Sequence, residues 1–290
     1  MAVQSSLLTK AVSNAMQRIA PTFLAGSWDN VGLLLGWFQV HVVSATHNAQ
    51  NRQLHLLPGC PIALTPAVCD EAIALGAGVV VSYHTPIFSG LKSLTLSTPL
   101  QASLLRCAAN GVSVYSPHSA LDGIWGGIND WLAEIISGSA SERRVLLPAT
   151  TKDEGGDGRR VELDQPTELD ELVSRVKAGL GLSSIQVGYS PIRTDRLVRS
   201  VAICAGSGAS MFAEAKEPVD VYFTGEMQHH EVLAAVGKGT HVILCGHTNT
   251  ERGYLPLLKA KLQAELLGDD GLGEVEVVVS ASDKHPLEVV

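Results

Sequence analysis

Three histidines each follow a short apolar run that is typical of a buried strand: His84, His118 and His247. Asp122 and Glu251 stand four positions after the second and the third of them. A spacing of four brings two side chains together on a helical turn, and imidazole with carboxylate is the donor set of catalytic Zn, Mn or Fe sites. Because ligands collect at the carboxyl ends of parallel strands, we expect the three loops to converge on a divalent metal. The alternative interpretation is that these side chains cap helices and form surface hydrogen bonds.

A glycine-rich turn follows another apolar run. Gly206, Ser207 and Gly208 come directly after the strand predicted to begin at Leu197 and precede a predicted helix. Backbone N–H groups at a helix N-terminus bind phosphate or carboxylate. The turn is therefore a candidate anion site, although the same residues also make ordinary tight turns.

The segment 224–231 carries two adjacent histidines beside two carboxylates. Such groups can serve as general acid and base or hold a metal ligand in place. Adjacent helical side chains diverge by about 100°, so at most one of His229 and His230 is expected to point into a site. Glu226 and His229 are the candidate acid/base residues. A solvated helix start is the competing interpretation.

Apolar runs alternate with helical segments along the whole chain, which predicts an α/β fold with layered and largely parallel sheets. Thr65 followed by Pro66 is typical of a helix start. A first helix is predicted to bury Leu8, Val12, Ala15 and Ile19. Strands are predicted at 79–81, 112–115, 185–187, 197–205, 220–223, 242–245 and 274–279.

Two segments lack any period. Residues 138–160 are polar and glycine-rich, which predicts a linker between an N-terminal lobe, residues 1–137, and a C-terminal lobe, residues 161–290. Residues 37–61 are predicted to be an irregular or disordered insertion.

The composition excludes several classes of protein. With 46% apolar and 17% charged residues in a chain of 290, the protein is expected to be globular rather than disordered. No apolar run approaches the roughly 18 residues of a membrane span. The net charge of −8 disfavours nucleic-acid binding. The five scattered cysteines are typical of reduced thiols, so a cytoplasmic protein is expected. Because no acid precedes Asp29, a mitochondrial presequence is an alternative to the first helix.

Five ordered motifs together resemble the NGG-one-interacting-factor-three-like family, also labelled GTP cyclohydrolase I type 2. The resemblance covers nearly the whole chain and implies two interlinked α/β lobes, a toroidal homohexamer and a two-metal site at the carboxyl ends of strands. The motifs are WDNVGLL (28–34), SYHTPIFSGLKSL (82–94), PHSALDGIWGGINDWLAE (117–134), GEMQHHEVLAA (225–235) and GHTNTER (246–252).

Matching these motifs implies that the metal ligands are His84, Asp122, His247 and Glu251, with His118 as a further candidate. Many bacterial relatives carry two consecutive histidines where this chain has Tyr83 and His84, so occupancy by one or two ions depends on that tyrosine. Two further features depart from the family pattern. Ala63 stands where relatives usually have an aspartate, and the segment 37–61 replaces a short connection and a regular strand. Either a genuine insertion or a gene-model artefact would produce such a segment.

Two functions follow from the resemblance. The first is a metal-dependent hydrolase that acts on a nucleotide such as GTP or on a related small molecule. The second is a non-catalytic interaction or scaffold protein linked to transcriptional regulation, with a structural or vestigial metal; a nuclear location is an alternative to the cytoplasm for the protein. A transcription-regulator protein would be its partner.

Overall fold

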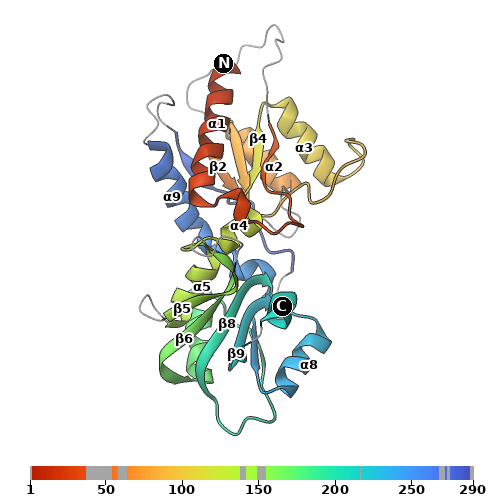
Figure 1. Cartoon of the computed structure of the whole chain (residues 1–290). Helices are drawn as coiled ribbons and strands as arrows, with labels where there is room; N and C mark the ends of the chain where they lie inside the picture. The colour runs from red at the N-terminus through yellow and green to blue at the C-terminus, as the bar shows by residue number, and fades with distance from the viewer. Residues whose placement is uncertain are drawn as a thin grey trace. The chain divides into compact units, whose positions relative to one another are not determined.

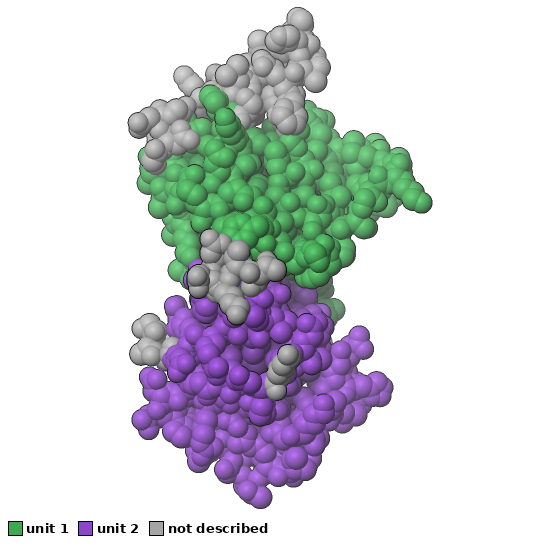
Figure 2. Space-filling view, in the orientation of Figure 1, with its two compact units in different colours: residues 1–121, 255–290 green, residues 122–254 purple. Residues whose placement is uncertain are grey.

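The computed structural model describes residues 2–36, 54–57, 64–137, 142–148, 155–215, 217–267, 272 and 275–287. The chain forms two compact units, which Figure 2 shows in different colours. Unit 1 consists of residues 1–121 together with 255–290, and unit 2 of residues 122–254. Each unit holds one sheet with helices, so the predicted α/β class is confirmed.

The sheet of unit 1 has five strands in the order β1-β4-β3-β2-β11. Strands β2, β3, β4 and β11 pair in parallel with their neighbours, whereas β1 is antiparallel to β4. Val81 of β3 lies opposite Tyr115 of β4, so the chain leaves both strands at the same edge of the sheet. The strands are β1 (Gly32–Leu35), β2 (Leu54–Leu57), β3 (Val79–Ser82), β4 (Ser113–Ser116) and β11 (Val277–Val279).

The helices of unit 1 begin where the sequence provides caps. The Thr65 side chain accepts a hydrogen bond from the Val68 N–H, and Thr98 accepts one from Gln101. Pro66 and Pro99 occupy the first helical positions, where no backbone donor is needed. The helices are α1 (Ala2–Ile19), α2 (Pro66–Ala74), α3 (Pro99–Ala109) and α9 (Leu255–Leu267), with a short 3-10 turn η1 (Thr22–Leu24).

Helices α1 and α9 lie side by side in unit 1 (Figure 1), although most of the chain separates them in sequence. As predicted, Leu8, Val12 and Ala15 of α1 are buried, whereas Ile19, also predicted to be buried, is only half-buried. Arg18 of α1 forms an ion pair with Glu265 of α9 at 2.5 Å. The last part of the chain thus completes the unit that the first part begins.

The sheet of unit 2 has six strands in the order β5-β6-β8-β9-β10-β7. Strands β8, β9 and β10 are parallel, and the flanking pairs are antiparallel. Leu244 of β10 lies opposite Thr224 of β9, so both strands end at the same edge. The strands are β5 (Glu142–Pro148), β6 (Gly156–Glu168), β7 (Gln186–Gly188), β8 (Leu197–Ser207), β9 (Val221–Glu226) and β10 (His241–Leu244).

Helices and short turns connect these strands of unit 2. They are α5 (Ile128–Ser137), α6 (Leu169–Leu180), α7 (Ala209–Glu214), α8 (His229–Gly237), η2 (His247–Thr250) and η3 (Arg252–Tyr254), and a further helix, α4 (His118–Gly123), joins unit 1 to unit 2 in the sequence.

The expected linker at 138–160 instead contains β5 and the start of β6, which pair antiparallel. The polar composition suggested a linker, but Arg159 of β6 is fully buried, because its charge is neutralised by Asp130 at 2.8 Å. Of the predicted insertion at 37–61, residues 54–57 form strand β2, and the remainder lies outside the described residues. Within the described residues, none of the helices has the length and apolar character to cross a bilayer.

Candidate metal centre

In unit 1, the loops after β3 and β4 bring an imidazole pair together. His84 is buried, with 6% of its surface exposed, and its ring centre lies 5.3 Å from that of His118. The Tyr83 ring lies 5.0 Å from His84 and 5.5 Å from His118. His84 and His118 thus lie together where the neighbouring strands β3 and β4 end, and the convergence of all three histidine loops on a metal stays a prediction.

In unit 2, the loop after β10 places His247 between two carboxylates. Nε2 of His247 lies 3.2 Å from Oε1 of Glu251, and Nδ1 lies 2.9 Å from Oε1 of Glu226 at the end of β9. Because a carboxylate only accepts, Glu226 holds the proton on Nδ1. This leaves Nε2 beside the Glu251 carboxylate, which is the arrangement found when a second carboxylate orients a metal-binding histidine.

Charge and burial at this pair favour binding of a cation. Glu251 is only 4% exposed, so its negative charge is poorly solvated. Burial alone would lower the pKa of His247, but its hydrogen bonds to Glu251 and Glu226 and their charges outweigh burial and raise that pKa to about 9. In the absence of a metal ion, a proton therefore supplies the positive charge that this pair of carboxylates requires.

The turn at 206–208 supports the His247–Glu251 pair. A Cβ on Gly206 would lie 2.9 Å from both Oε1 of Glu251 and Nε2 of His247, so any other residue at this position would displace the two donor atoms. The Gly206 N–H donates to Thr250 at 2.9 Å and is therefore engaged within the protein. The anion role expected for Gly206, Ser207 and Gly208 stays a prediction, which can rest only on the N–H groups of Ser207 and Gly208.

Asp122 lies at the start of unit 2 and is half-buried. Burial raises the pKa of the Cys204 thiol far above its usual range, and the charges of Asp122, Asp157 and Glu251 raise it further. Cys204 therefore experiences the negative potential of Asp122 and Glu251 together, which is the potential that attracts a divalent cation.

A buried arginine fixes the segment that follows Asp122. Arg159 Nη2 donates to the carbonyl oxygens of Gly123 at 3.2 Å and Ile124 at 2.8 Å, and its Nε donates to Asp130 at 3.0 Å. The guanidinium also lies 4.4 Å from the centre of the Trp125 ring. Arg159 thus holds the backbone that positions Asp122.

The other predicted acid/base residue, His229, lies at the exposed start of α8. Its ring contacts that of His230 with centres 5.4 Å apart. The start of this helix is closed by a capping box between Gln228 and Glu231. Of the two predicted acid/base residues, Glu226 contacts His247, at 2.9 Å from its Nδ1.

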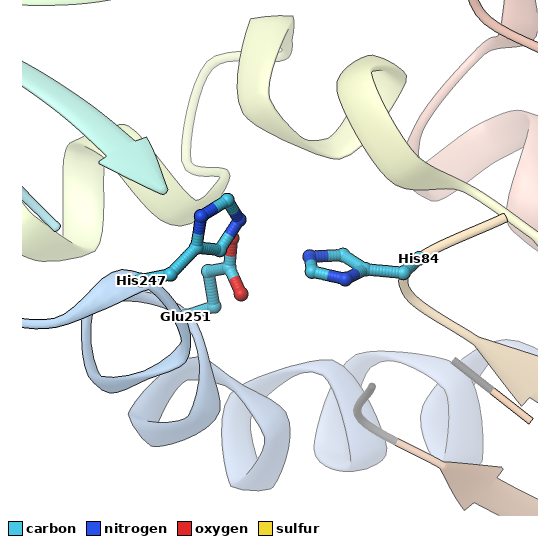
Figure 3. A group of neighbouring side chains, drawn as sticks. All are labelled: His84, His247 and Glu251. Atoms are coloured by element: carbon cyan, nitrogen blue, oxygen red, sulfur yellow. The ribbon is translucent and has the colours of Figure 1, made fainter. Parts of the chain in front are cut away.

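His84 of unit 1 and His247 with Glu251 of unit 2 offer two imidazoles and one carboxylate as candidate metal donors (Figure 3). Figure 3 draws His247 and Glu251 on the segment after β10, and His84 on the loop after β3. Two imidazoles with one carboxylate fit Zn, Mn or Fe, and leave positions for water or substrate. In unit 2, the close approach of Gly206 to the His247 and Glu251 donor atoms and the Glu226–His247 hydrogen bond hold these two donors in place.

Sequence reasoning missed Asp29, whose carboxylate accepts a hydrogen bond from Nδ1 of His118 at 2.8 Å. Asp29 lies in a loop before β1, 89 positions from its partner, so no spacing rule connects the two residues. Its place in the motif 28–34 was the only available signal.

Comparison with known proteins gives consistent results. The profile of the family Duf34/NIF3 (NGG1p interacting factor 3) matches residues 7–286. The "Protein NIF3 homolog" of Schizosaccharomyces pombe is 41% identical over 97% of both chains, and the "NGG1-interacting factor 3" of Saccharomyces cerevisiae is 36% identical over 99% of both. The crystal structure of a Bacillus cereus protein related to NIF3 has the same fold, with a TM-score of 0.73 at 20% identity over 96% of this chain and 98% of that one. The chain therefore belongs to the Duf34/NIF3 family.

Proposed function

We propose that this protein is a divalent-metal-dependent hydrolase that acts on a nucleotide or a related small molecule. The observation that carries the proposal is His247 held between Glu226 and Glu251, with a pKa of about 9. The His247–Glu251 pair, with Glu226 on the other side of the imidazole, is typical of metal ligands and their orienting carboxylate rather than of a helix cap.

In this proposal, one or two Zn, Mn or Fe ions would be held by the ligands that the family resemblance implies: His84, Asp122, His247 and Glu251, with His118 as a further candidate. The support is the chemistry of these donors, which combine neutral imidazole nitrogen with carboxylate oxygen. Tyr83 takes the position where many bacterial relatives have a histidine. A phenol is a poor donor near neutral pH, so the second ion is expected to bind more weakly than the first.

When bound, such a cation acts as a Lewis acid and lowers the pKa of water at the site toward neutrality. The residues of the chain hold the reaction in place. Glu226 keeps the proton on Nδ1 of His247, so the proton on Nε2 is the one that a cation would displace, and Glu251 supplies the negative charge. His229, which is exposed three positions after Glu226, is the proposed acid/base group for the leaving atom.

A nucleotide substrate is proposed from the Gly206–Ser207–Gly208 turn and from the family resemblance. The N–H groups of Ser207 and Gly208 would bind a phosphate close to the His247–Glu251 pair, because Gly206 lies directly beneath that pair. The overall charge of −8 opposes binding of a polyphosphate, so the cation must offset it locally.

The direct experiment measures bound metal and turnover on the same sample. Purified protein is stripped by chelation, reloaded with Mn, Zn or Fe, and offered a panel of purine and pyrimidine nucleotides. Hydrolysis that requires the metal and is lost in Glu251→Gln supports the proposal. Full metal occupancy with no turnover of any nucleotide in the panel contradicts it.

A second candidate is an interaction protein, favoured by the printed name of the S. cerevisiae relative, which is 36% identical. In this alternative, the metal is structural and the partner is a transcription regulator. Calorimetric titration with purified NGG1 protein tests this alternative. Tight binding that persists in a variant that no longer binds metal, together with no turnover of nucleotides, favours this function over the hydrolase.

The proposal also covers the oligomeric state and the cellular location of the protein. We expect a closed homo-oligomer, with a hexamer as the family resemblance implies, in the cytoplasm or alternatively in the nucleus or mitochondria. Neither membranes nor nucleic acids are expected partners. Light scattering that finds a monomer at micromolar concentration contradicts the assembly.

A further inference from the structure

We propose that Asp29 is a positioning residue, which fixes His118 with the proton on Nδ1 and presents the Nε2 lone pair as a ligand for a divalent cation. This inference rests on the proposed function for the identity of the ligand. It assigns a role to Asp29, and it concerns unit 1 alone.

The Asp29 carboxylate is fully enclosed, with none of its side-chain surface exposed. Its Oδ2 accepts hydrogen bonds from His118 Nδ1 at 2.8 Å, from the Ser119 N–H at 3.1 Å and from the Ser119 hydroxyl at 2.6 Å. Its Oδ1 accepts one from the Asn30 N–H at 2.8 Å. Both oxygens are thus engaged, and the carboxylate cannot turn away from His118.

These bonds determine which nitrogen of His118 carries the proton. An ionised carboxylate has no hydrogen to donate, so the Nδ1 facing it must be the N–H group. The neutral imidazole then has its lone pair on Nε2, at the opposite side of the ring. Metal-binding histidines are oriented in this way by carboxylates that do not themselves touch the metal.

The surroundings hold the plane of the His118 ring as well. Its neighbours meet it nearly edge-on, with interplanar angles of 72° for Tyr83, 74° for His84 and 88° for Trp28. Ring centres are separated by 5.3 to 5.9 Å. The imidazole is therefore fixed both in tautomer and in orientation beside His84, a second candidate ligand.

The backbone at His118 is strained, which is typical of functional positions. Its φ is 26°, and within the described residues it is the one non-glycine residue with a positive φ. Such a conformation costs about 1–3 kcal/mol and persists only where the surroundings impose it. The Asp29 bonds to His118 and Ser119 hold the turn here, together with the bond from the His118 N–H to the Tyr83 carbonyl at 3.1 Å. A purely structural role for Asp29, as a brace for this turn, is therefore the alternative that an experiment must separate.

The experiment uses the whole chain labelled with 15N-histidine, and reads the tautomer of His118 by NMR in the metal-free protein, well above the ordinary imidazole pKa of about 6.5. The His118 signals are assigned by their absence from His118→Gln. We expect one tautomer, with Nδ1 protonated, in the natural protein. In Asp29→Asn, the amide can donate as well as accept, so a substantial population with the proton on Nε2 is expected.

Cobalt or zinc affinity gives the second readout. Asp29→Asn is expected to weaken binding by about 10–100-fold, the range found when the orienting partner of a ligand is lost. Ser119→Ala is the matched control, because it removes the hydroxyl that donates to Asp29 and accepts from the Gly26 N–H, and it leaves the Asp29–His118 bond in place. It is expected to keep both the tautomer and the affinity. In a His118→Gln background, Asp29→Asn should weaken binding no further.

An unchanged tautomer in Asp29→Asn would overturn the proposal, and so would an equal loss of affinity in the His118→Gln background or in Ser119→Ala. These outcomes are distinguishable from failure of the proposed function. If the natural protein binds no divalent cation, the proposed function fails, while the tautomer measurement still decides whether Asp29 positions His118.

Discussion

Nε2 of His247 lies 3.2 Å from Oε1 of Glu251, four positions later in the chain, on a segment that forms a 3-10 turn rather than an α-helix. The two donors come from opposite ends of that turn, and Glu251 ends it with a φ of −122°. The Glu251 side chain is 5% exposed and that of His247 is 24% exposed. This geometry brings an imidazole and a carboxylate together in a nearly dry environment, where an added cation interacts strongly with both.

Metal affinity is expected to rise with pH. Because the pKa of metal-free His247 is raised to about 9, its Nε2 carries a proton at neutral pH, which a metal ion must displace. Affinity should therefore increase about tenfold per pH unit between pH 7 and 9 and level off above that range. Calorimetric titration with Zn or Mn across this range measures the effect. Affinity that is constant, or that falls with rising pH, contradicts the assignment of His247 as a ligand.

The same raised pKa predicts the pH dependence of stability in the metal-free protein. His247 binds its proton more tightly in the folded state than in the unfolded state, where its pKa is about 6.5. The resulting contribution is complete below that value and is lost as the pH rises through about 9. Urea denaturation of the natural protein and of His247→Gln is expected to show a difference that shrinks with rising pH. A difference that grows with pH would show that the sign is wrong.

Glu226→Gln is expected to weaken metal binding by about 10–100-fold, because the partner that holds the proton on Nδ1 of His247 is lost. The fold should persist, since the Glu226 side chain is 57% exposed. Glu171→Gln, an exposed carboxylate on α6 of the same unit, is the control. Equal metal affinity in both variants is the result that argues against Glu226 as the orienting group.

Gly206→Ala is expected to abolish tight metal binding, because its Cβ would lie 2.9 Å from both donor atoms. Gly206 also has a φ of +65°, so strain alone costs stability. Gly181→Ala is a matched control, since Gly181 has a φ of +66° and nothing lies within 4 Å of a Cβ there. Both variants should lose about 1–2 kcal/mol of the free energy of unfolding. Retention of full metal affinity in Gly206→Ala would count against the site.

Arg159→Met is expected to lower the free energy of unfolding by about 3 kcal/mol, because the buried Asp130 would lose its nearer cation and keep only the ion pair with Arg143 at 3.7 Å. Arg175→Met removes the exposed ion pair with Glu171 and should cost at most about 0.5 kcal/mol. Chemical denaturation compares the two variants. Similar losses would show that Arg159 does not hold the segment after Asp122.

The sequence predicts the framework of the site better than its details. Apolar runs ending in His84, His118 and His247 locate the strand ends correctly, because buried parallel strands require such runs. The Thr65–Pro66 start is confirmed since capping is a local interaction. By contrast, burial of Arg159 depends on Asp130, 29 positions away, which a search for periodicity cannot detect. For the same reason, the strands β5 and β6 were predicted to be a linker.

Orientation of the ligands was equally beyond sequence reasoning. Glu226 was a candidate for acid/base chemistry, and its contact with Nδ1 of His247 follows from the register of β9 and β10, which the sequence does not specify. Asp29 reaches His118 from a loop with no regular period. Such long-range hydrogen bonds are made by tertiary packing, so only coordinates reveal them.

The central claim is that Glu251 is a ligand of a divalent cation, and the most direct measurement is elemental analysis of Glu251→Gln beside the natural protein, after chelation and reloading. The buried amide keeps the shape of the side chain and removes its charge. Circular dichroism and the unfolding midpoint confirm that each sample is folded. We predict at least about one metal ion per chain in the natural protein, and loss of most of this metal in Glu251→Gln. An equal metal content in the two folded proteins would contradict the account.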